Sequence, residues 1–588
     1  MQPVCLATTP DPTLAFLHLP SAECARETAV LLCPPFGWEE MCSYRARRRW
    51  AQALAEEGYP TARIDLPGSG DSGGSAGVPR RLEVSTKTVS DAAQWLRERT
   101  GCVRLVAIGI GIGGMLSCDA LGVGAPIDDL ILWGVPAHGR TLLRELRAYS
   151  GMVAARYPAD MRPLPDGALE LTGFLMTAET ARALEALRLT ELDLPEAPDR
   201  RVLLLERGAL GIDERLKEYF EQCGASVTVA DGSDYDALIA HPQQARNPVH
   251  AIASTISWLP AGVSRGTSGV RASGKRECDR LELCFDGEAI WETPMAFELE
   301  EGQAFGVRSE PADGHGSPVC AVLLNGGALR HTGPNRTWVE IARRWAARGV
   351  PTVRLDLLGI GDADGEERER VPNPSLYAPE TTSQVLAVLE QLRASELPER
   401  FVLAGLCSGA YWALHGALAD ARVVGALMIN LYAFYWSAEL VAERETRDAL
   451  TAPLRGTVWR KLARRDVETE QLRAAVAHVL PGRIRAGARR PVETAERERI
   501  NRALDQLRDQ QTEALLLFSQ GEPLYDQLLR QRQLERLDSW PNVIVEQIPS
   551  GDHMFRALWL QRYVHGSVDR ALERSLARSA ASEPQGRG

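Results

Sequence analysis

The sequence lacks several features that would place the protein in a special class. Its 588 residues contain no apolar run of about 18 residues, and the N-terminus has neither the basic segment nor the long apolar segment of a signal peptide. Positive charge is not in excess either, because 67 Lys and Arg stand against 78 Asp and Glu, a formal net charge of −11. No overall basic field therefore favours nucleic acid or an anionic membrane surface. We expect a cytoplasmic protein that binds neither.

Motifs for metals and disulfides are also missing. The eleven cysteines show no CxxC spacing, and the ten histidines show no HxxxH or HxH cluster. These spacings predict neither a disulfide framework nor a metal site, and most cysteines are expected to be free, buried thiols. No cofactor is expected. The composition, with 45% hydrophobic and 25% charged residues, is typical of a globular protein, and the length favours two to four domains.

A long internal repeat is present. Residues 29–74 and residues 321–365 each read as an apolar strand, a Gly/Pro-rich loop, an amphipathic helix with a Trp, and a short strand that ends in Asp before a Gly-x-Gly-Asp turn. Downstream of these segments the matched positions keep the same order in both halves. The number of residues that separates the two members of a pair rises from 292 for the first pair to 318 for the last. The matched pairs are Ala29 with Ala321, Asp65 with Asp356, Gly109 with Gly405, Gly208 with Gly521, and Asp234 with Asp552. This collinear drift indicates a duplication with small insertions and deletions.

A Gly/Ser-rich stretch over residues 261–276 separates the two halves and carries too little apolar surface to form a core. The sequence therefore predicts a first domain over 1–262, a flexible linker over 263–277 and a second domain over 278–578. A polar, disordered tail is expected over 579–588.

Within each half, short apolar runs alternate with helical patterns, which predicts an α/β fold with a mostly parallel sheet flanked by helices. A helical insertion over about 435–510 interrupts the second half. The strands expected there are Ala321–Leu324, Thr352–Leu355, Phe401–Ala404, Val424–Ile429 and Ala514–Phe518.

A tight turn follows the third of these strands. It reads Gly405-Leu406-Cys407-Ser408-Gly409, and the helix after it has an apolar face. The two glycines suit a turn whose strained backbone leaves no room for side chains. The turn resembles the Gly-x-Ser-x-Gly nucleophile elbow of α/β-hydrolases, with Cys407 in the place of the serine.

The order of the other polar residues fits the same family. Glu522-Pro523 and Asp526 follow the strand Ala514–Phe518, and His553 lies near the end of the chain in Gly-Asp-His-Met-Phe. The family places its acid and its histidine at these points. The resemblance implies a catalytic triad of Cys407, His553 and one of the two carboxylates, Glu522 or Asp526, between which the sequence does not decide.

In a Cys–His pair the thiol ionises readily to the nucleophilic thiolate, because an imidazolium lowers the pKa of a neighbouring thiol. The carboxylate fixes the imidazole, and backbone N–H groups face the oxyanion that forms on the substrate. One such group belongs to Ser408. The resemblance places the others in the loop after the first strand of the second half, at Gly326, Gly327 and Ala328.

The first half has lost these groups. Its elbow reads Gly109-Ile110-Gly111-Ile112-Gly113, so Gly111 stands at the nucleophile position. Asp213 matches Asp526, and Tyr235 stands where the second half has His553. We expect a degenerate, inactive first domain that packs on the second domain or on a second subunit.

An alternative interpretation of the glycines is a dinucleotide-binding fingerprint, Gly109-x-Gly111-x-x-Gly114. Such a fingerprint opens the first βαβ unit and has an acidic residue at the end of the next strand. Here two strands precede it, and Asp128 and Asp129 lie before the next strand. The repeat explains the glycines better, as a decayed elbow.

The insertion in the second half is basic. Residues 455–499 contain twelve Arg and Lys against six Asp and Glu, in a chain that is acidic overall. In α/β-hydrolases an insertion at this point forms a lid. A basic lid is suited to an acidic acyl or peptidyl carrier protein, and the alternative is a set of solvated Arg-rich helices.

As a whole the chain resembles a tandem α/β-hydrolase whose second half is similar to the serine aminopeptidase-like group. The cysteine elbow is similar to those of dienelactone hydrolases, polyhydroxyalkanoate synthases and Dieckmann-type cyclases. Because thioester exchange at a thiolate costs little, we expect an acyl-transferring or thioesterase-like enzyme that forms an acyl-Cys407 intermediate from carrier-protein or coenzyme A thioesters, as in specialised metabolism. The alternatives are an ester or lactone hydrolase and a non-catalytic scaffold or binding protein.

Overall fold

The computed structural model describes residues 1–588 except 22–23, 155–163, 166, 198, 241–244, 261–275, 315, 328, 366–373, 396, 438–488 and 582–588. Two compact units make up the chain. Unit 1 comprises Met1–Val371 and Met554–Gly566, and unit 2 comprises Pro372–His553 and Ser567–Gly588. Unit 1 thus contains the predicted first domain together with the first strands of the second.

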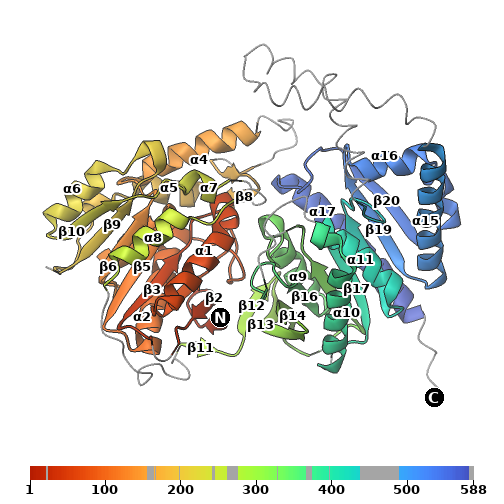
Figure 1. The fold of residues 1–588 in the computed structure, drawn as a ribbon, viewed down its shortest axis with the longest axis horizontal. Coiled ribbons are helices and arrows are strands. Elements are labelled where there is room, and N and C mark those ends of the chain that lie inside the picture. Colours follow the sequence, from red (N-terminus) through yellow and green to blue (C-terminus); the bar gives the residue numbers. More distant parts are fainter. Residues whose placement is uncertain are drawn as a thin grey trace, which may run out of the picture. The chain divides into compact units, whose positions relative to one another are not determined.

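The first sheet of unit 1 has nine strands in the order β10-β9-β6-β5-β3-β4-β2-β1-β11 (Figure 1). The strands from β10 to β4 are parallel to their neighbours, and β2, β1 and β11 pair antiparallel at one edge. The strand bounds are β1 (Gln2–Leu6), β2 (Thr13–His18), β3 (Thr28–Cys33), β4 (Thr61–Ile64), β5 (Arg104–Ile110), β6 (Asp129–Trp133), β9 (Arg201–Leu205), β10 (Ser226–Ala230) and β11 (Glu277–Cys278).

Helices cover both faces of this sheet, and the burial along each strand shows why. Side chains alternate between faces along a strand. In β3, Ala29 and Leu31 pack into one apolar core, while Val30 and Leu32 pack into the other. The helices are α1 (Trp38–Glu56), α2 (Arg81–Thr100), α3 (Ile112–Gly122), α4 (Gly139–Ala154), α5 (Ala178–Ala186), α6 (Glu214–Gln222), α7 (Tyr235–Leu238) and α8 (Val249–Trp258), with a small hairpin of β7 (Leu169–Leu171) and β8 (Phe174–Met176).

Unit 1 also contains five strands of the second half, in the order β12-β13-β14-β16-β15. The pair β15 and β16 is parallel, and the other neighbours are antiparallel. Their bounds, with the helix between the last two, are β12 (Leu281–Phe285), β13 (Glu288–Leu299), β14 (Gly302–Pro311), β15 (Val319–Leu324), α9 (Thr337–Ala347) and β16 (Thr352–Asp356).

Unit 2 holds four parallel strands in the order β17-β18-β19-β20 with helices around them. The helix α17 (Leu558–Ala581) begins in unit 1 and ends in unit 2. The other elements are the 3₁₀ segments η6 (Pro374–Tyr377) and η9 (Leu534–Ser539), with α10 (Pro379–Ala394), β17 (Arg400–Leu406), α11 (Ser408–Ala419), β18 (Val423–Ile429), α15 (Arg489–Asp509), β19 (Glu513–Ser519), α16 (Pro523–Arg530) and β20 (Val543–Ile548).

The predicted fold class is confirmed, because the described strands form large mixed, mostly parallel sheets flanked by helices. The five strands expected in the second half appear within two residues of their predicted ends. The antiparallel strands β12 to β14 were not expected. The turn Asp286-Gly287, with φ of 51° and 88°, is the hairpin signal that marks them.

Parts of the predicted domain plan lie outside the described residues. These are most of the linker, over 261–275, most of the lid, over 438–488, and the end of the tail, over 582–588. Glu277 and Cys278, at the predicted end of the linker, form β11 in the first sheet. The domain boundaries themselves stay a prediction.

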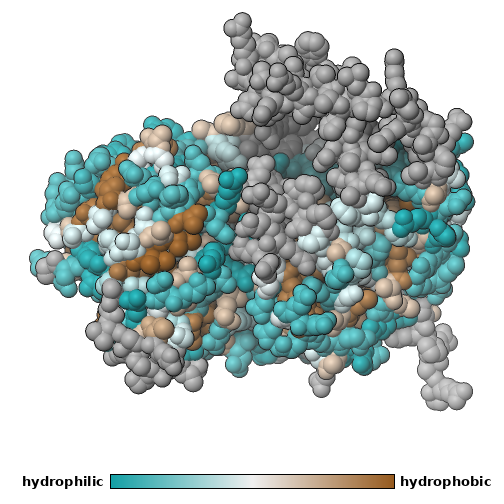
Figure 2. Space-filling view, viewed as in Figure 1, coloured by the Kyte–Doolittle hydropathy of each residue, from teal (hydrophilic) through white to brown (hydrophobic). Residues whose placement is uncertain are grey.

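The surface visible in Figure 2 is mainly hydrophilic where it is coloured, with apolar patches between polar side chains. None of the helices in the described part of the chain combines the length and the apolar character that a membrane crossing needs.

Candidate active site

The predicted nucleophile lies at a strained turn in unit 2. Cys407 separates β17 from α11 and has φ 55° and ψ −109°, a conformation that non-glycine residues rarely adopt. A Cβ atom on Gly405 would lie 2.1 Å from the carbonyl carbon of Gly409, so the turn requires glycine there. The Cys407 backbone N–H donates to the Ile429 carbonyl at 2.9 Å. The elbow geometry predicted from the motif is therefore present.

The other two groups lie beside this turn. His553 Nδ1 is 2.7 Å from Glu522 Oε1, and the imidazole shares a hydrogen bond with the Cys407 thiol. Because Nδ1 faces the carboxylate, Nε2 remains for the sulfur. Glu522 is buried at the N-terminus of α16, and the Ser519 hydroxyl donates to its Oε1 at 2.9 Å. The structure thus brings Cys407, His553 and Glu522 together.

Asp526, the other carboxylate that the sequence left open, has a different environment. It lies in the first turn of α16 and is exposed. Its backbone N–H donates to the Glu522 carbonyl. The geometry therefore favours Glu522 as the partner of His553.

Burial and hydrogen bonding shift the pKa of the Cys407 thiol in opposite directions, and they also oppose each other at the His553 imidazole. Burial raises the pKa of the Cys407 thiol, but the hydrogen bond and the positive charge of His553 outweigh it and leave the pKa below its ordinary value. Burial likewise disfavours the imidazolium, yet the sulfur and Glu522 hold the pKa of His553 well above its ordinary value. Near neutral pH this arrangement favours a thiolate–imidazolium pair.

Asn430, which the sequence analysis did not single out, ties the acid loop to the histidine loop. It follows β18 with φ 47°, and its Nδ2 donates to the His553 carbonyl at 2.7 Å. Its Oδ1 accepts the Ser519 N–H at 2.7 Å. One buried amide therefore fixes the segments on which Glu522 and His553 depend. A single Asn after a strand forms no sequence motif.

A cluster of aromatic side chains lies next to the thiol. The Tyr377 hydroxyl is 3.8 Å from Cys407 Sγ, and its ring stacks on Trp436 with centroids 5.7 Å apart and planes at 6°. Tyr411 meets Tyr377 edge-on at 5.2 Å, and Tyr432 lies 6.4 Å away. The buried Trp412 Nε1 donates to the Leu376 carbonyl, which anchors η6 and so Tyr377. These rings place apolar area beside the sulfur.

The Tyr377 hydroxyl contributes to lowering the pKa of Cys407 because it donates a hydrogen bond to the sulfur. We expect Tyr377→Phe to raise the pKa of the thiol and to slow its alkylation by iodoacetamide near pH 6 by about fivefold, the worth of one weak hydrogen bond. Alkylation rates measured against pH check this, with Tyr432→Phe as the control that leaves the sulfur untouched. An unshifted profile in Tyr377→Phe would show that the hydroxyl has no such role.

The predicted oxyanion groups are divided between the two units of the chain. In unit 2, Ser408 is fully buried as the first residue of α11. In unit 1, Gly326 and Gly327 follow β15, and Gly327 has φ 59°. Ala328 lies outside the described residues. The described end of the predicted lid is α15, whereas most of the basic segment 455–499 is not described.

The predicted degenerate site of the first half has the backbone of an elbow with glycine at the predicted nucleophile position. Gly111 has φ 53° and ψ −121°, close to the values of Cys407. A Cβ there would lie 3.2 Å from Glu39 Oε2 and 3.8 Å from the Tyr235 hydroxyl. Asp213 instead caps α6 and accepts the Ala137 N–H at 3.0 Å. The elbow and the histidine position thus face each other here also, and the acid position does not join them.

Glu39 fills the space beside this empty elbow. Burial raises its pKa to about 7, and it shares a hydrogen bond with Tyr235. Glu39 carries no signal in the sequence, because the second half has His331 at the matching position. The neighbouring Gly113 would place a Cβ 2.3 Å from the Pro34 carbonyl, so close packing accounts for this glycine. That supports the decayed elbow over the dinucleotide fingerprint.

Three side chains of unit 1 have the composition of a metal site. Ligand atoms of His331, Asp356 and Asp362 lie within 4.8 Å of one another. Both ring nitrogens of His331 already face carboxylates, Nδ1 that of Asp356 at 2.7 Å and Nε2 that of Asp71 at 2.8 Å. An imidazolium with two N–H donors has no lone pair for a metal. The arrangement favours a buried ion-pair cluster.

Comparisons with known proteins bear on the second half. Residues 321–574 match the family model described as the alpha/beta hydrolase family. Among curated proteins, no sequence matches this chain. One similar solved structure is a hypothetical protein from Pseudomonas aeruginosa, with 16% identity and a TM-score of 0.30 over 44% of this chain and 92% of that chain. A second is an α/β serine hydrolase without lid from Xanthomonas campestris, with 15% identity and a TM-score of 0.25 over 39% of this chain and 82% of that chain. A third is Est1E from Butyrivibrio proteoclasticus with ferulic acid bound, with 15% identity and a TM-score of 0.29 over 39% of this chain and 89% of that chain.

The family match covers less than half of the chain, and the relation of the first half to the same family stays a prediction. The match supports an enzyme of the hydrolase class. Residues 321–574 therefore form an alpha/beta hydrolase family domain.

Proposed function

We propose that the protein cleaves an ester or thioester through an acyl-enzyme intermediate on Cys407. The observation that carries the proposal is the hydrogen-bonded series Cys407–His553–Glu522 at a strained elbow, with the pKa of the thiol lowered and that of the imidazole raised. A side chain activated in this way at the end of a parallel strand is suited to nucleophilic catalysis.

The first half of the reaction forms the acyl-enzyme. The Cys407 thiolate attacks the acyl carbonyl carbon, and the carbonyl oxygen becomes an oxyanion facing backbone N–H groups. The tetrahedral intermediate collapses, the bond to the leaving oxygen or sulfur breaks, and His553 Nε2–H protonates the leaving group. The alcohol or thiol departs, and an acyl thioester on Cys407 remains.

Water completes the cycle. Neutral His553 accepts a proton from a water molecule as its oxygen attacks the thioester carbonyl. The second intermediate expels the Cys407 thiolate and releases the carboxylic acid, and the retained proton restores the imidazolium. Glu522 accepts the hydrogen bond from Nδ1–H and stabilises this cation.

The test is intact-protein mass spectrometry after brief incubation with a panel of aryl esters and acyl thioesters, with peptide mapping of the adduct. We expect one acyl group per chain on Cys407 and none elsewhere. Iodoacetamide at neutral pH should modify Cys407 first, because burial raises the pKa of Cys33 and Cys320 to about 12. A Cys407 that neither acylates nor alkylates faster than the exposed Cys24 would instead indicate a non-catalytic binding protein.

Transfer to an acceptor other than water is the second candidate, and the cysteine itself favours it. A thioester on Cys407 remains reactive toward amine, alcohol and thiol acceptors. Carrier-protein or coenzyme A thioesters as donors, and an acyl or peptidyl carrier protein as partner, belong to this alternative. Adding candidate acceptors to the pre-formed acyl-enzyme separates the two, since transfer produces acylated acceptor faster than free acid.

A further inference from the structure

The two halves of the repeat meet within unit 1 and exchange ion pairs there. Arg63 of the first half binds Asp362 of the second at 2.9 Å, and Arg354 of the second binds Asp71 of the first at 3.1 Å. In the repeat, Arg63 corresponds to Arg354 and Asp71 to Asp362. All four side chains are buried. Each half therefore places its strand arginine against the last aspartate of the other half's Gly-x-Gly-Asp turn, which is the contact pattern of a two-fold symmetric dimer.

An apolar cluster is also shared by the two halves. Phe16 of β2 and Phe305 of β14 meet edge-on with ring centroids 5.7 Å apart. The buried members of this cluster come from both halves and are Cys5, Leu14, Phe16, Leu281, Phe305, Val307 and Ala363. The strand β11 extends the contact, because Glu277 and Cys278 of the second half pair with β1 of the first. The hydrophobic effect is non-directional, so the cluster adds affinity but does not select the partner.

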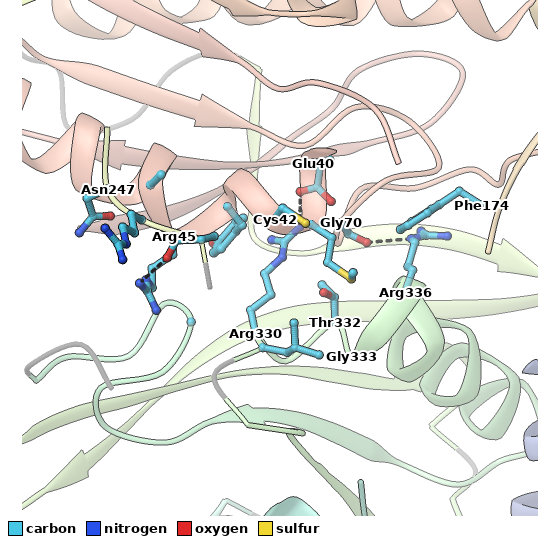
Figure 3. A pocket seen from close by; sticks show the side chains of 17 residues that line it. Glu40, Cys42, Arg45, Gly70, Phe174, Asn247, Arg330, Thr332, Gly333 and Arg336 are labelled. Atoms are coloured by element: carbon cyan, nitrogen blue, oxygen red, sulfur yellow. Dashed lines mark hydrogen bonds and ion pairs between the residues drawn. The ribbon is translucent and has the colours of Figure 1, made fainter. Parts of the chain in front are cut away.

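Arginines of the second half also reach the backbone of the first half's turn. Arg336 donates to the Gly70 and Ser72 carbonyls, each at 2.8 Å, and Figure 3 shows the first of these contacts. Arg343 donates to the Asp71 carbonyl at 2.8 Å. The cavity in Figure 3 has a volume of about 40 Å³, which has room for water but not for a substrate. This part of unit 1 is therefore a packed interface between the halves.

Two further cations of the second half meet carboxylates of the first. The Arg330 guanidinium lies 3.2 Å from Asp65 Oδ2 and 3.2 Å from Glu40 Oε1 (Figure 3). His331 Nε2 lies 2.8 Å from Asp71 Oδ2. All five side chains are buried. Because a buried charge without a partner is costly, these contacts favour the pairing of this face of the first half with this face of the second.

The first half lacks these two cations. It has Trp38 and Glu39 at the positions that match Arg330 and His331. Two first halves brought together in the same way would therefore leave buried carboxylates without these partners, which opposes their association. The charges thus distinguish a second half from another copy of the first.

We propose that the first half serves as a built-in partner subunit of the second, and that the two halves associate without help from the linker. The shared apolar cluster supplies the affinity, and Arg330 and His331 select a second half over another first half. The inference is independent of the proposed function. It gives the first half a role that does not need a nucleophile, because Gly111 takes no part in these contacts.

The test is to cut the chain between its halves. A recognition site for a specific protease takes the place of residues 265–271 in the predicted linker, and the cut protein is analysed by native mass spectrometry and gel filtration. We expect one first half to stay bound to one second half down to about 100 nM, since interfaces with paired buried charges and an apolar centre reach nanomolar affinity. Fragments that separate at about 1 µM, or pairs of two first halves, would overturn the proposal.

Arg330→Gln in the cut protein tests the selecting contacts. We expect the dissociation constant of the two fragments to rise at least about 100-fold, because two buried carboxylates lose this partner. The matched control is Arg104→Gln, whose partner Asp129 lies 2.6 Å away in the same half. It should change the dissociation constant by no more than about threefold. An unchanged constant in Arg330→Gln, or an equal rise in the control, would contradict the proposal.

A variant that does not fold in the uncut chain is replaced. Arg336→Gln then stands in for Arg330→Gln, since its guanidinium contacts backbone carbonyls of the first half and Glu340 of its own. The expected rise of the dissociation constant is about tenfold, the worth of hydrogen bonds from a charged donor. No rise in this variant would count against the proposal in the same way.

The exchanged ion pairs give a second measurement on the cut protein. One double-mutant cycle combines Arg63→Met with Asp362→Asn. A second combines Arg354→Met with Asp71→Asn. We expect each double variant to bind at least about tenfold more tightly than the product of its two single losses predicts, since each pair acts across the interface. Losses that simply multiply in either cycle would overturn the two-fold arrangement.

Discussion

Cys407→Ala is expected to lower ester and thioester turnover by at least about 10⁴-fold and to abolish the acyl adduct, because no other group at the elbow can form the intermediate. The neighbouring Ser408 cannot replace it. Its side chain is fully buried at the start of α11, and it follows the strained turn instead of occupying it. The measurement is kcat/KM for a p-nitrophenyl ester, with the mass of the intact chain recorded after substrate addition.

Gly111→Ala is the matched control. Gly111 has a φ of 53°, and Cys407, which carries a Cβ, has nearly the same φ of 55°. An alanine at position 111 can therefore adopt the backbone conformation that the turn requires. The nearest atom to that Cβ is Glu39 Oε2 at 3.2 Å, which requires a small shift. We expect turnover within about twofold of the wild type, since the first half supplies no nucleophile. Substantial turnover in Cys407→Ala, or loss of turnover in Gly111→Ala, would contradict the assignment of the chemistry to the second half.

The elbow was predictable because its chemistry is local. A turn between strand and helix needs glycines on both sides of the nucleophile, so five consecutive residues carry the signal for Cys407. The repeat added a second copy with the same backbone angles at Gly111. The choice between Glu522 and Asp526 was not predictable. The two residues are four positions apart, and only the start of α16 decides that Glu522 turns inward while Asp526 faces solvent.

Residues that act through tertiary contacts left no such signal. Asn430 touches Ser519 and the His553 backbone, segments about 90 and 120 residues away, and no spacing in the sequence encodes that. The same holds for the buried cluster of Asp71, His331 and Asp356, whose members come from three separate segments. The arginines Arg63 and Arg354 do lie at matched positions of the repeat. Each of them pairs with an aspartate of the other half, Arg63 with Asp362 and Arg354 with Asp71, and this depends on how the two halves meet within unit 1.

The stability of the chain should fall as the pH rises above 7, because His331 is protonated in the folded state. Burial opposes the charge, but Asp71 and Asp356 raise the pKa of His331 to about 10, against about 6.5 in an unfolded chain. Asp362, Arg330 and Arg354 also face this cluster. A group whose pKa is raised by folding stabilises the fold fully below its unfolded pKa and ceases to do so as the pH passes its folded pKa. The free energy of unfolding should therefore decrease from pH 6.5 to 10, by at most about 1.4 kcal/mol per pH unit.

The cleanest measurement is urea denaturation of the full chain at pH 7.0 and 8.5, a window above the ordinary pKa of His and below that of most cysteines. His331→Gln is the reference, since it keeps every other titrating group. The buried His18 and His565, with pKa lowered to about 2 and about 3, take up protons only below this window. We expect the wild type to lose about 2 kcal/mol more than the variant across it. Equal losses in both proteins would mean that His331 is neutral in the fold, and one of its two carboxylates would then have to carry the proton.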